Sequence, residues 1–125
     1  MAVTHAITVT SADDSGRTLT LTGTAVSSNR EIGVSQAIIA AQTNLLVPMS
    51  YLVANLKSIF ILSDQNCTVK TNSSGAPQET ITLVAGIPFV WQYQSGVAVP
   101  FAGDVTAWYV TNTLALNLKA RILSS

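Results

Sequence analysis

Apolar and polar residues alternate along much of this chain with a period of two, which is the pattern of half-buried β-strands. The clearest case is Arg17–Val26, where Leu19 and Leu21 alternate with threonines. Val3–Ser11 and Glu79–Val84 show the same alternation. Because threonine is β-branched and its hydroxyl tolerates water, a row of threonines suits the exposed face of a strand. These segments are therefore predicted to be strands with one buried side.

A different pattern, a nearly continuous apolar run, fills Asn55–Asp64. Its apolar residues are Leu56, Ile59, Phe60, Ile61 and Leu62. A short run of this kind, bounded by polar turn residues, is typical of a strand that is covered on both faces. We therefore predict that this segment is a central strand of the core.

Two segments between these are less clear. The apolar residues of Arg30–Ala41 fit a strand, whereas its alanine-rich second half fits a helical turn. Helix propensity is a weak guide by itself, and we predict a strand. The apolar segment Asn44–Val53 contains Pro48, which cannot donate to a sheet and so indicates an edge, a bulge or a break.

Turn signals divide the chain at regular intervals. Turns or loops are predicted at Ala12–Gly16, Ser27–Asn29 and Asn72–Pro77. The other candidate strands are Cys67–Thr71, Ile87–Gln94, Val97–Phe101, Asp104–Thr111 and Leu114–Leu123. In the last of these, the residues expected to face inward are Leu114, Leu116, Leu118, Ala120 and Ile122. About eight to ten short strands, with a turn about every 8–12 residues, predict one all-β antiparallel domain over residues 1–125, a sandwich or a barrel.

The low content of charged residues indicates a role for the protein as well as a fold. The chain has six Lys and Arg and six Asp and Glu, or 10% charged residues, and it carries 15 Thr and 13 Ser instead. An ordinary soluble domain has about 25% charged residues. Ile32–Leu56 and Thr80–Gly103 contain no charge at all. We interpret this as a surface that other subunits largely cover, because charged residues are depleted at the cores of interfaces.

The net charge of zero and the pI of about 6.5 give no reason to expect binding to nucleic acid or to an anionic membrane. The uncharged segment Ile32–Leu56 contains Pro48 and several amide side chains, which argues against a membrane-spanning helix. The first residues lack the basic and apolar regions of a signal peptide. We therefore expect assembly in a cytoplasm.

The sequence offers no recognisable catalytic, cofactor or metal site. Cys67 is the single cysteine, so it is expected to be a small buried side chain without an internal disulfide. His5 is the single histidine and lies near a terminus, and neither a metal site nor a serine–histidine enzyme is expected from it. The adjacent Asp13 and Asp14 fit a solvated turn. We predict that the protein is not an enzyme.

The aromatic residues remain open to two interpretations. Aromatic side chains are enriched in cores and in subunit interfaces, and they also form stacking platforms for sugars in many β-sandwich modules. The residues in question are Trp91, Tyr93, Trp108 and Tyr109. We favour core and interface. Val3 and Ile7 join them as interface candidates, because residues 1–11 could form an N-terminal arm or an edge strand that crosses to a neighbouring subunit.

One resemblance adds to this reading. It rests on the order Leu56–Asp64, Cys67–Pro77 and Glu79–Leu83, followed by Asp104–Asn112 and Leu118–Leu123. This order resembles small structural proteins of tailed bacteriophages over about residues 30–125. The resemblance implies a jelly-roll-like β-sandwich on the capsid exterior, a decoration or cement protein without catalytic residues. Its partners would be the major capsid protein and copies of itself, as a dimer or trimer. A tail or baseplate protein, or a carbohydrate- or receptor-binding module, is the alternative.

Overall fold

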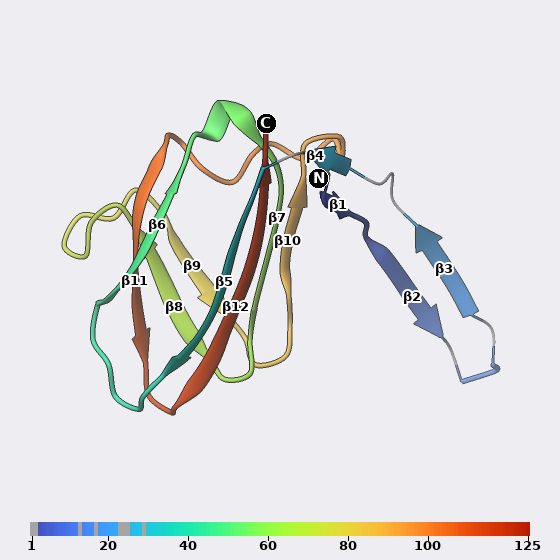
Figure 1. Cartoon of the computed structure of the whole chain (residues 1–125). Coiled ribbons are helices and arrows are strands. Elements are labelled where there is room, and N and C mark those ends of the chain that lie inside the picture. The colour runs from blue at the N-terminus through green and yellow to red at the C-terminus, as the bar shows by residue number, and fades with distance from the viewer. Residues whose placement is uncertain (1–2, 13, 17, 23–25, 29) are drawn as a thin grey trace.

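The computed structural model describes residues 3–12, 14–16, 18–22, 26–28 and 30–125. In this part of the chain, eight strands form two four-stranded antiparallel sheets, and four shorter strands form an N-terminal arm (Figure 1). The eight strands of the two sheets are β5 (Arg30–Ile38), β6 (Leu45–Tyr51), β7 (Leu56–Ser63), β8 (Cys67–Thr71), β9 (Thr80–Leu83), β10 (Phe89–Gln92), β11 (Val105–Asn112) and β12 (Leu116–Ser124). A single 3₁₀ turn at Val53–Asn55 separates β6 from β7.

The order of the strands is that of a jelly roll. One sheet runs β10-β7-β12-β5, and the other runs β6-β11-β8-β9. The first strand pairs with the last, β5 with β12, and the next pairs are β6 with β11, β7 with β10 and β8 with β9, all antiparallel. This nesting is obtained when one long hairpin is wound into two facing sheets, the jelly-roll arrangement of eight strands. The predicted all-β sandwich is therefore confirmed.

The core fills the space between the two sheets. Trp108 is fully buried at the centre of β11, and its indole N–H donates to the hydroxyl of Tyr51, 3.3 Å away. From the opposite sheet, Ile59, Leu118 and Ile122 are also fully buried. These residues lie at alternate positions of their strands, so the period-two pattern of the sequence corresponds to one inward-facing row in each strand.

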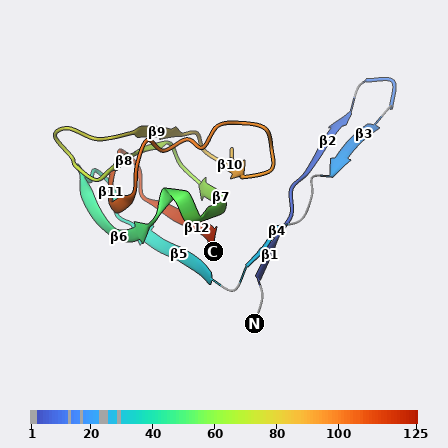
Figure 2. The same ribbon diagram turned by 90° about the horizontal axis from the view of Figure 1, so that it is seen from above.

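The arm consists of two small strand pairs. β1 (Val3–His5) pairs with β4 (Val26–Ser28), and β2 (Thr8–Ala12) pairs with β3 (Thr18–Thr22). The β2–β3 hairpin projects away from the sandwich, whereas β1 and β4 lie at its side, as the two views in Figures 1 and 2 agree. The sequence predicted one strand over Val3–Ser11, and the structure divides it at Ala6 and Ile7.

Several other predictions can be compared with this structure. The choice of a strand for Arg30–Ala41 is confirmed by β5, and Pro48 lies in β6, an edge strand. Val97–Phe101 was predicted as a strand and is instead part of the loop between β10 and β11. Ser27 and Ser28 belong to β4 rather than to a turn, and Asn29 lies outside the described residues. Leu114 was expected inward but is 59% exposed, because β12 begins two residues later.

The prediction for the apolar run Asn55–Asp64 is partly wrong. Its strand β7 is central, as expected, and Ile59 and Ile61 face the core. Its second face, however, is not covered by another layer of the sandwich: Phe60 is half-buried and Leu62 is 39% exposed. In a jelly roll each sheet packs against the other sheet on one side only. Any cover for this outer apolar face must therefore come from outside the sandwich.

Candidate docking site between the arm and the sandwich

The outer face of the β10-β7-β12-β5 sheet is arranged in rows that the strand register defines. Gln92, Ser58, Leu123 and Glu31 are consecutive partners across the sheet and form one row. The next row consists of Val90, Phe60, Arg121 and Gly33. A third row includes Leu62, Lys119 and Ser35. Residues directly opposite in a ladder point to the same face, so each row is a line of neighbouring side chains.

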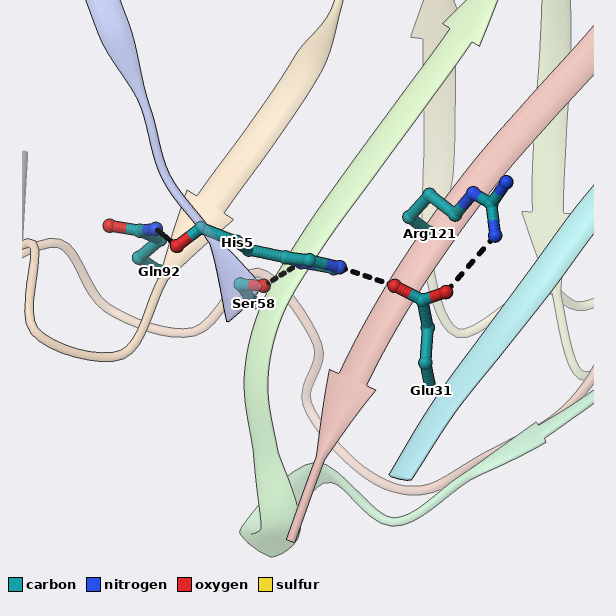
Figure 3. A network of polar contacts seen from close by, with 5 residues as sticks. All are labelled: His5, Glu31, Ser58, Gln92 and Arg121. Carbon is teal, nitrogen blue, oxygen red and sulfur yellow. Dashed lines mark hydrogen bonds and ion pairs between the residues drawn. The ribbon is translucent and has the colours of Figure 1, made fainter. Parts of the chain in front are cut away.

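The arm is attached over the first of these rows by His5 (Figure 3). The imidazole of His5 is hydrogen-bonded through Nδ1 to Ser58 Oγ, and its Nε2 lies 2.7 Å from Glu31 Oε2. The ring also stacks on Phe60, with 4.6 Å between the ring centroids. Gln92 Nε2 donates to the backbone carbonyl of His5 at 3.3 Å. His5 is only 5% exposed, which its position near the terminus did not indicate.

The types of side chain determine which groups donate and which accept in this network. A carboxylate can only accept, so Nε2–H of His5 donates to Glu31, and in that tautomer the Ser58 hydroxyl donates to Nδ1. The other carboxylate oxygen, Oε1, accepts from Arg121 Nη1 at 3.0 Å. The hydrogen bond from His5 is the main cause that holds the pKa of Glu31 below its ordinary value of 4.5, with a further contribution from Arg121. Glu31 thus connects the arm to β12.

Gly33 makes room for this connection. A Cβ atom at position 33 would lie 3.1 Å from Arg121 Nη1, which is closer than most Cβ contacts. The guanidinium of Arg121 therefore lies against Gly33 while it bonds to Glu31, two residues earlier on the same strand. A larger residue at this position would push the guanidinium away from the carboxylate.

Ser58, His5 and Glu31 have the residue types of a hydrolase triad, but their burial does not suit catalysis. Ser58 is 0% exposed and His5 is 5% exposed. A nucleophilic hydroxyl must reach a substrate carbonyl at about hydrogen-bond distance while its base takes the proton. Ser58 has no surface at which a substrate could approach. The arrangement is suited instead to fixing the arm, and its buried polar groups are paired. In the described part of the chain, every buried side-chain polar atom has a hydrogen-bond partner.

Beside this anchor is an apolar groove of about 620 Å³. Its floor is the outer face of the sheet, and one wall is the root of the arm. The lining residues are Ala6, Ile7, Thr8, Phe60, Ile61, Leu62, Pro88, Val90, Lys119, Ala120 and Arg121. The surface of the groove is mainly apolar, and the two cationic side chains of β12, Lys119 and Arg121, lie along one side. This groove is the open part of the face that the sequence predicted to be covered.

The residues that the sequence suggested for an interface have different positions. Trp108 and Trp91 are inside the monomer, with 0% and 8% exposure, and the indole N–H of Trp91 donates to the carbonyl of Val97 at 2.9 Å. For these two, the core part of the prediction holds, because their rings pack inside the monomer. Tyr93 is 44% exposed, with Lys57 Nζ 4.4 Å from its ring centroid.

The other three interface candidates, Tyr109, Val3 and Ile7, are half-buried, and of these Ile7 lines the groove. The structure therefore leaves a partner surface to Ile7 and the outer face of the sheet rather than to the tryptophans.

The single cysteine lies in the hydrophobic core. Cys67 is buried, and burial raises the pKa of its thiol. Among the described residues, no three or more His, Cys, Asp or Glu side chains converge in a way that could hold a metal ion. Within the same residues, no helix has the length and apolar character needed to cross a membrane.

Sequence reasoning missed the anchor and the groove for different reasons. His5 and Glu31 are far apart in the sequence, and no local pattern pairs them. The groove did have a signal in the sequence, because the apolar run of β7 predicted a strand that is covered on both faces. Comparison with known proteins adds nothing to this: no protein-family model, no curated protein and no solved structure matches this chain.

Proposed function

We propose that this chain is a structural protein of a bacteriophage virion, which decorates the outside of the capsid and stabilises the coat lattice. The observation that supports this most directly is the open apolar face of the β10-β7-β12-β5 sheet. Leu62 and Val90 are each 39% exposed there, next to the half-buried Phe60. Contiguous apolar surface rimmed by polar groups marks interaction sites in soluble proteins. Its chemistry fits a protein partner rather than a reaction.

Two further features support a subunit role. Jelly rolls of eight strands are common in viral capsid proteins and in lectins, although this is an analogy of fold, and the fold alone does not determine function. The low content of charge, 10% of residues, fits surfaces that other subunits cover. Many weak contacts of this kind, repeated over a lattice, add up to a stable shell. The partners would be the major capsid protein and copies of this chain.

The test uses particles of the phage that encodes the chain, with and without its gene. Purified protein is added to gene-deleted particles, which are then sedimented and heated with a dye that reports release of DNA. We expect the protein to sediment with the particles and to raise the temperature of DNA release. The variant Val90→Glu should bind less than Val84→Glu, which changes an exposed valine directly after β9 of the other sheet. Absence of the chain from wild-type particles, measured by mass spectrometry, would refute the proposal.

The alternatives are separated by position and by ligand. Antibody labelling seen by electron microscopy at the tail, rather than around the shell, would favour a tail or baseplate protein. A sugar-binding module would need exposed aromatic rings. Of the four rings considered for this role, Trp91 and Trp108 are buried and Tyr109 is half-buried, which leaves Tyr93 as the exposed one. The structure therefore favours a protein partner over a carbohydrate.

A further inference from the structure

Within the described residues, the β2–β3 hairpin receives the least packing support from neighbouring elements. Its two strands pair with each other in a sheet of two, and the hairpin extends away from the sandwich (Figures 1 and 2). A hairpin of two strands is marginally stable in water unless another layer packs on it. Its register aligns Val9 with Leu21 and Thr10 with Thr20, so the apolar alternation of both strands is in phase. Packing on an apolar surface would stabilise such a two-stranded ribbon.

The groove offers such a surface. It is an apolar cavity of about 620 Å³ on the outer face of a sheet, and a second β-layer packs about 10 Å above a sheet of this kind. The charges are complementary as well. Lys119 and Arg121 line the groove, whereas the described part of the hairpin's turn, residues 14–16, carries the exposed carboxylate of Asp14.

We infer that the groove is occupied by the β2–β3 hairpin of a second copy of this chain. The hairpin lies on the outer face of the partner's β10-β7-β12-β5 sheet, with Asp14 of its turn next to Lys119 and Arg121. If two copies exchange hairpins, each contact occurs twice, which is the usual way in which identical subunits form a closed dimer. This deepens the self-association part of the proposed function, but it concerns the purified protein and does not require a virion.

The first experiment measures self-association of the full chain by analytical ultracentrifugation. We expect a closed oligomer, and we expect Val90→Glu to weaken its association at least about tenfold, because an unpaired carboxylate would be buried in the contact. Val84→Glu, at an exposed valine outside the groove, should leave the association unchanged. A chain that stays monomeric at about 100 μM, or equal association of both variants, would overturn the inference. Circular dichroism checks that both variants are folded.

The second experiment locates the hairpin by disulfide trapping and does not depend on the effect of a buried charge. In a Cys67→Ala background, copies with Asp14→Cys are mixed with copies with Lys119→Cys and oxidised mildly. We expect a covalent pair of the two different copies. Thr106→Cys, an exposed position on β11 of the other sheet, is the matched control and should not cross-link with Asp14→Cys. If the control pair forms equally well, the hairpin is not held at the groove.

A single chain that carries both Asp14→Cys and Lys119→Cys separates exchange from folding back. Exchange predicts covalent oligomers from this double variant. A covalently closed monomer as the main product would show that the hairpin fills its own groove, and would overturn the inference. Neither result depends on whether the protein is found in virions, so failure here and failure of the proposed function can be told apart.

Discussion

The sandwich and the arm are built from similar sequence but are stabilised differently. Both consist of short strands with alternating apolar and polar residues. In the sandwich, each strand has neighbours that are distant in the sequence and an inner face in a shared core, with Trp108, Ile59 and Leu118 fully buried. In the arm, β2 pairs with β3 alone, and β1 with β4. The arm is anchored to the sandwich through the buried His5, which contacts Ser58, Glu31 and Phe60.

This difference indicates that alternation alone does not make a strand stable. A strand contributes to global stability when its apolar face is buried in a layer that unfolds together with it. The arm therefore should open in separate events, of lower free energy than global unfolding. The predictions that follow test this separation, and they are ordered from the largest expected effect to the smallest.

Leu118 and Leu114 provide the strongest contrast within one region. Leu118→Ala should lower the free energy of unfolding by about 2–5 kcal/mol, because it leaves a cavity in a closely packed core. Leu118 is 0% exposed, whereas Leu114, in the turn before the same strand, is 59% exposed. Leu114→Ala should change stability by less than about 0.5 kcal/mol. Urea unfolding measures both, and equal losses would contradict the position of the core.

His5→Ala should release the arm and leave the sandwich folded. The variant removes the partner of Ser58 and Glu31, which should cost about 1–3 kcal/mol in the attachment of the arm. Hydrogen exchange should become faster at the amides of β1 and β4, while β7 and β12 keep their protection. Arg121→Ala is the matched control. It removes an ion pair in which Arg121 is 65% exposed, worth less than about 1 kcal/mol. Equal loss of protection in β12 after His5→Ala would show that the arm and the sandwich unfold together.

Two glycines, one in the turn of the hairpin and one in a turn of the sandwich, test whether the arm opens separately from the sandwich, because the same substitution by alanine can be made at both. Gly16 in the hairpin turn has φ 82°, and Gly86 in the turn after β9 has φ 73°. At either position an alanine is strained by about 1–2 kcal/mol, because a left-handed backbone brings Cβ close to the carbonyl. Gly86→Ala should lower the free energy of global unfolding by about this amount. Gly16→Ala should leave the global transition unchanged and open only the hairpin. Equal shifts of the urea midpoint would argue against an independent arm.

Acid should weaken the attachment of the arm through Glu31. The pKa of Glu31 is lowered in the folded protein, chiefly by the hydrogen bond from His5, so the attached arm favours the ionised carboxylate. Its contribution is complete above the ordinary pKa of 4.5 and is lost as the pH falls through the lower, folded-state value. The amide NMR signals of β1 should report this loss as the pH is lowered below about 4.5. In Glu31→Gln, this acid step should be absent, and a step of the same size in that variant would exclude Glu31 as its cause.

The comparison also shows how far local pattern can be trusted. The alternation in Glu79–Val84 placed Ile81 and Leu83 in the core correctly, since strand period and burial are local properties. Val97–Phe101 failed as a strand because no neighbouring strand is available to pair with it in the loop between β10 and β11. The apolar run of β7 predicted a cover on both faces, and the monomer supplies it on one. That failure points to the groove.

The sequence by itself determined that this is one all-β chain, where most of its strands and turns lie, and that its surface carries little charge, because these follow from residue type and short-range period. The tertiary structure alone decided which strands pair, that His5 is buried against Ser58 and Glu31, and which apolar face stays open. Those features depend on contacts between residues far apart in the chain, such as Arg121 beside Phe60. A period of two specifies that a strand has two faces, and only the fold decides what covers each of them.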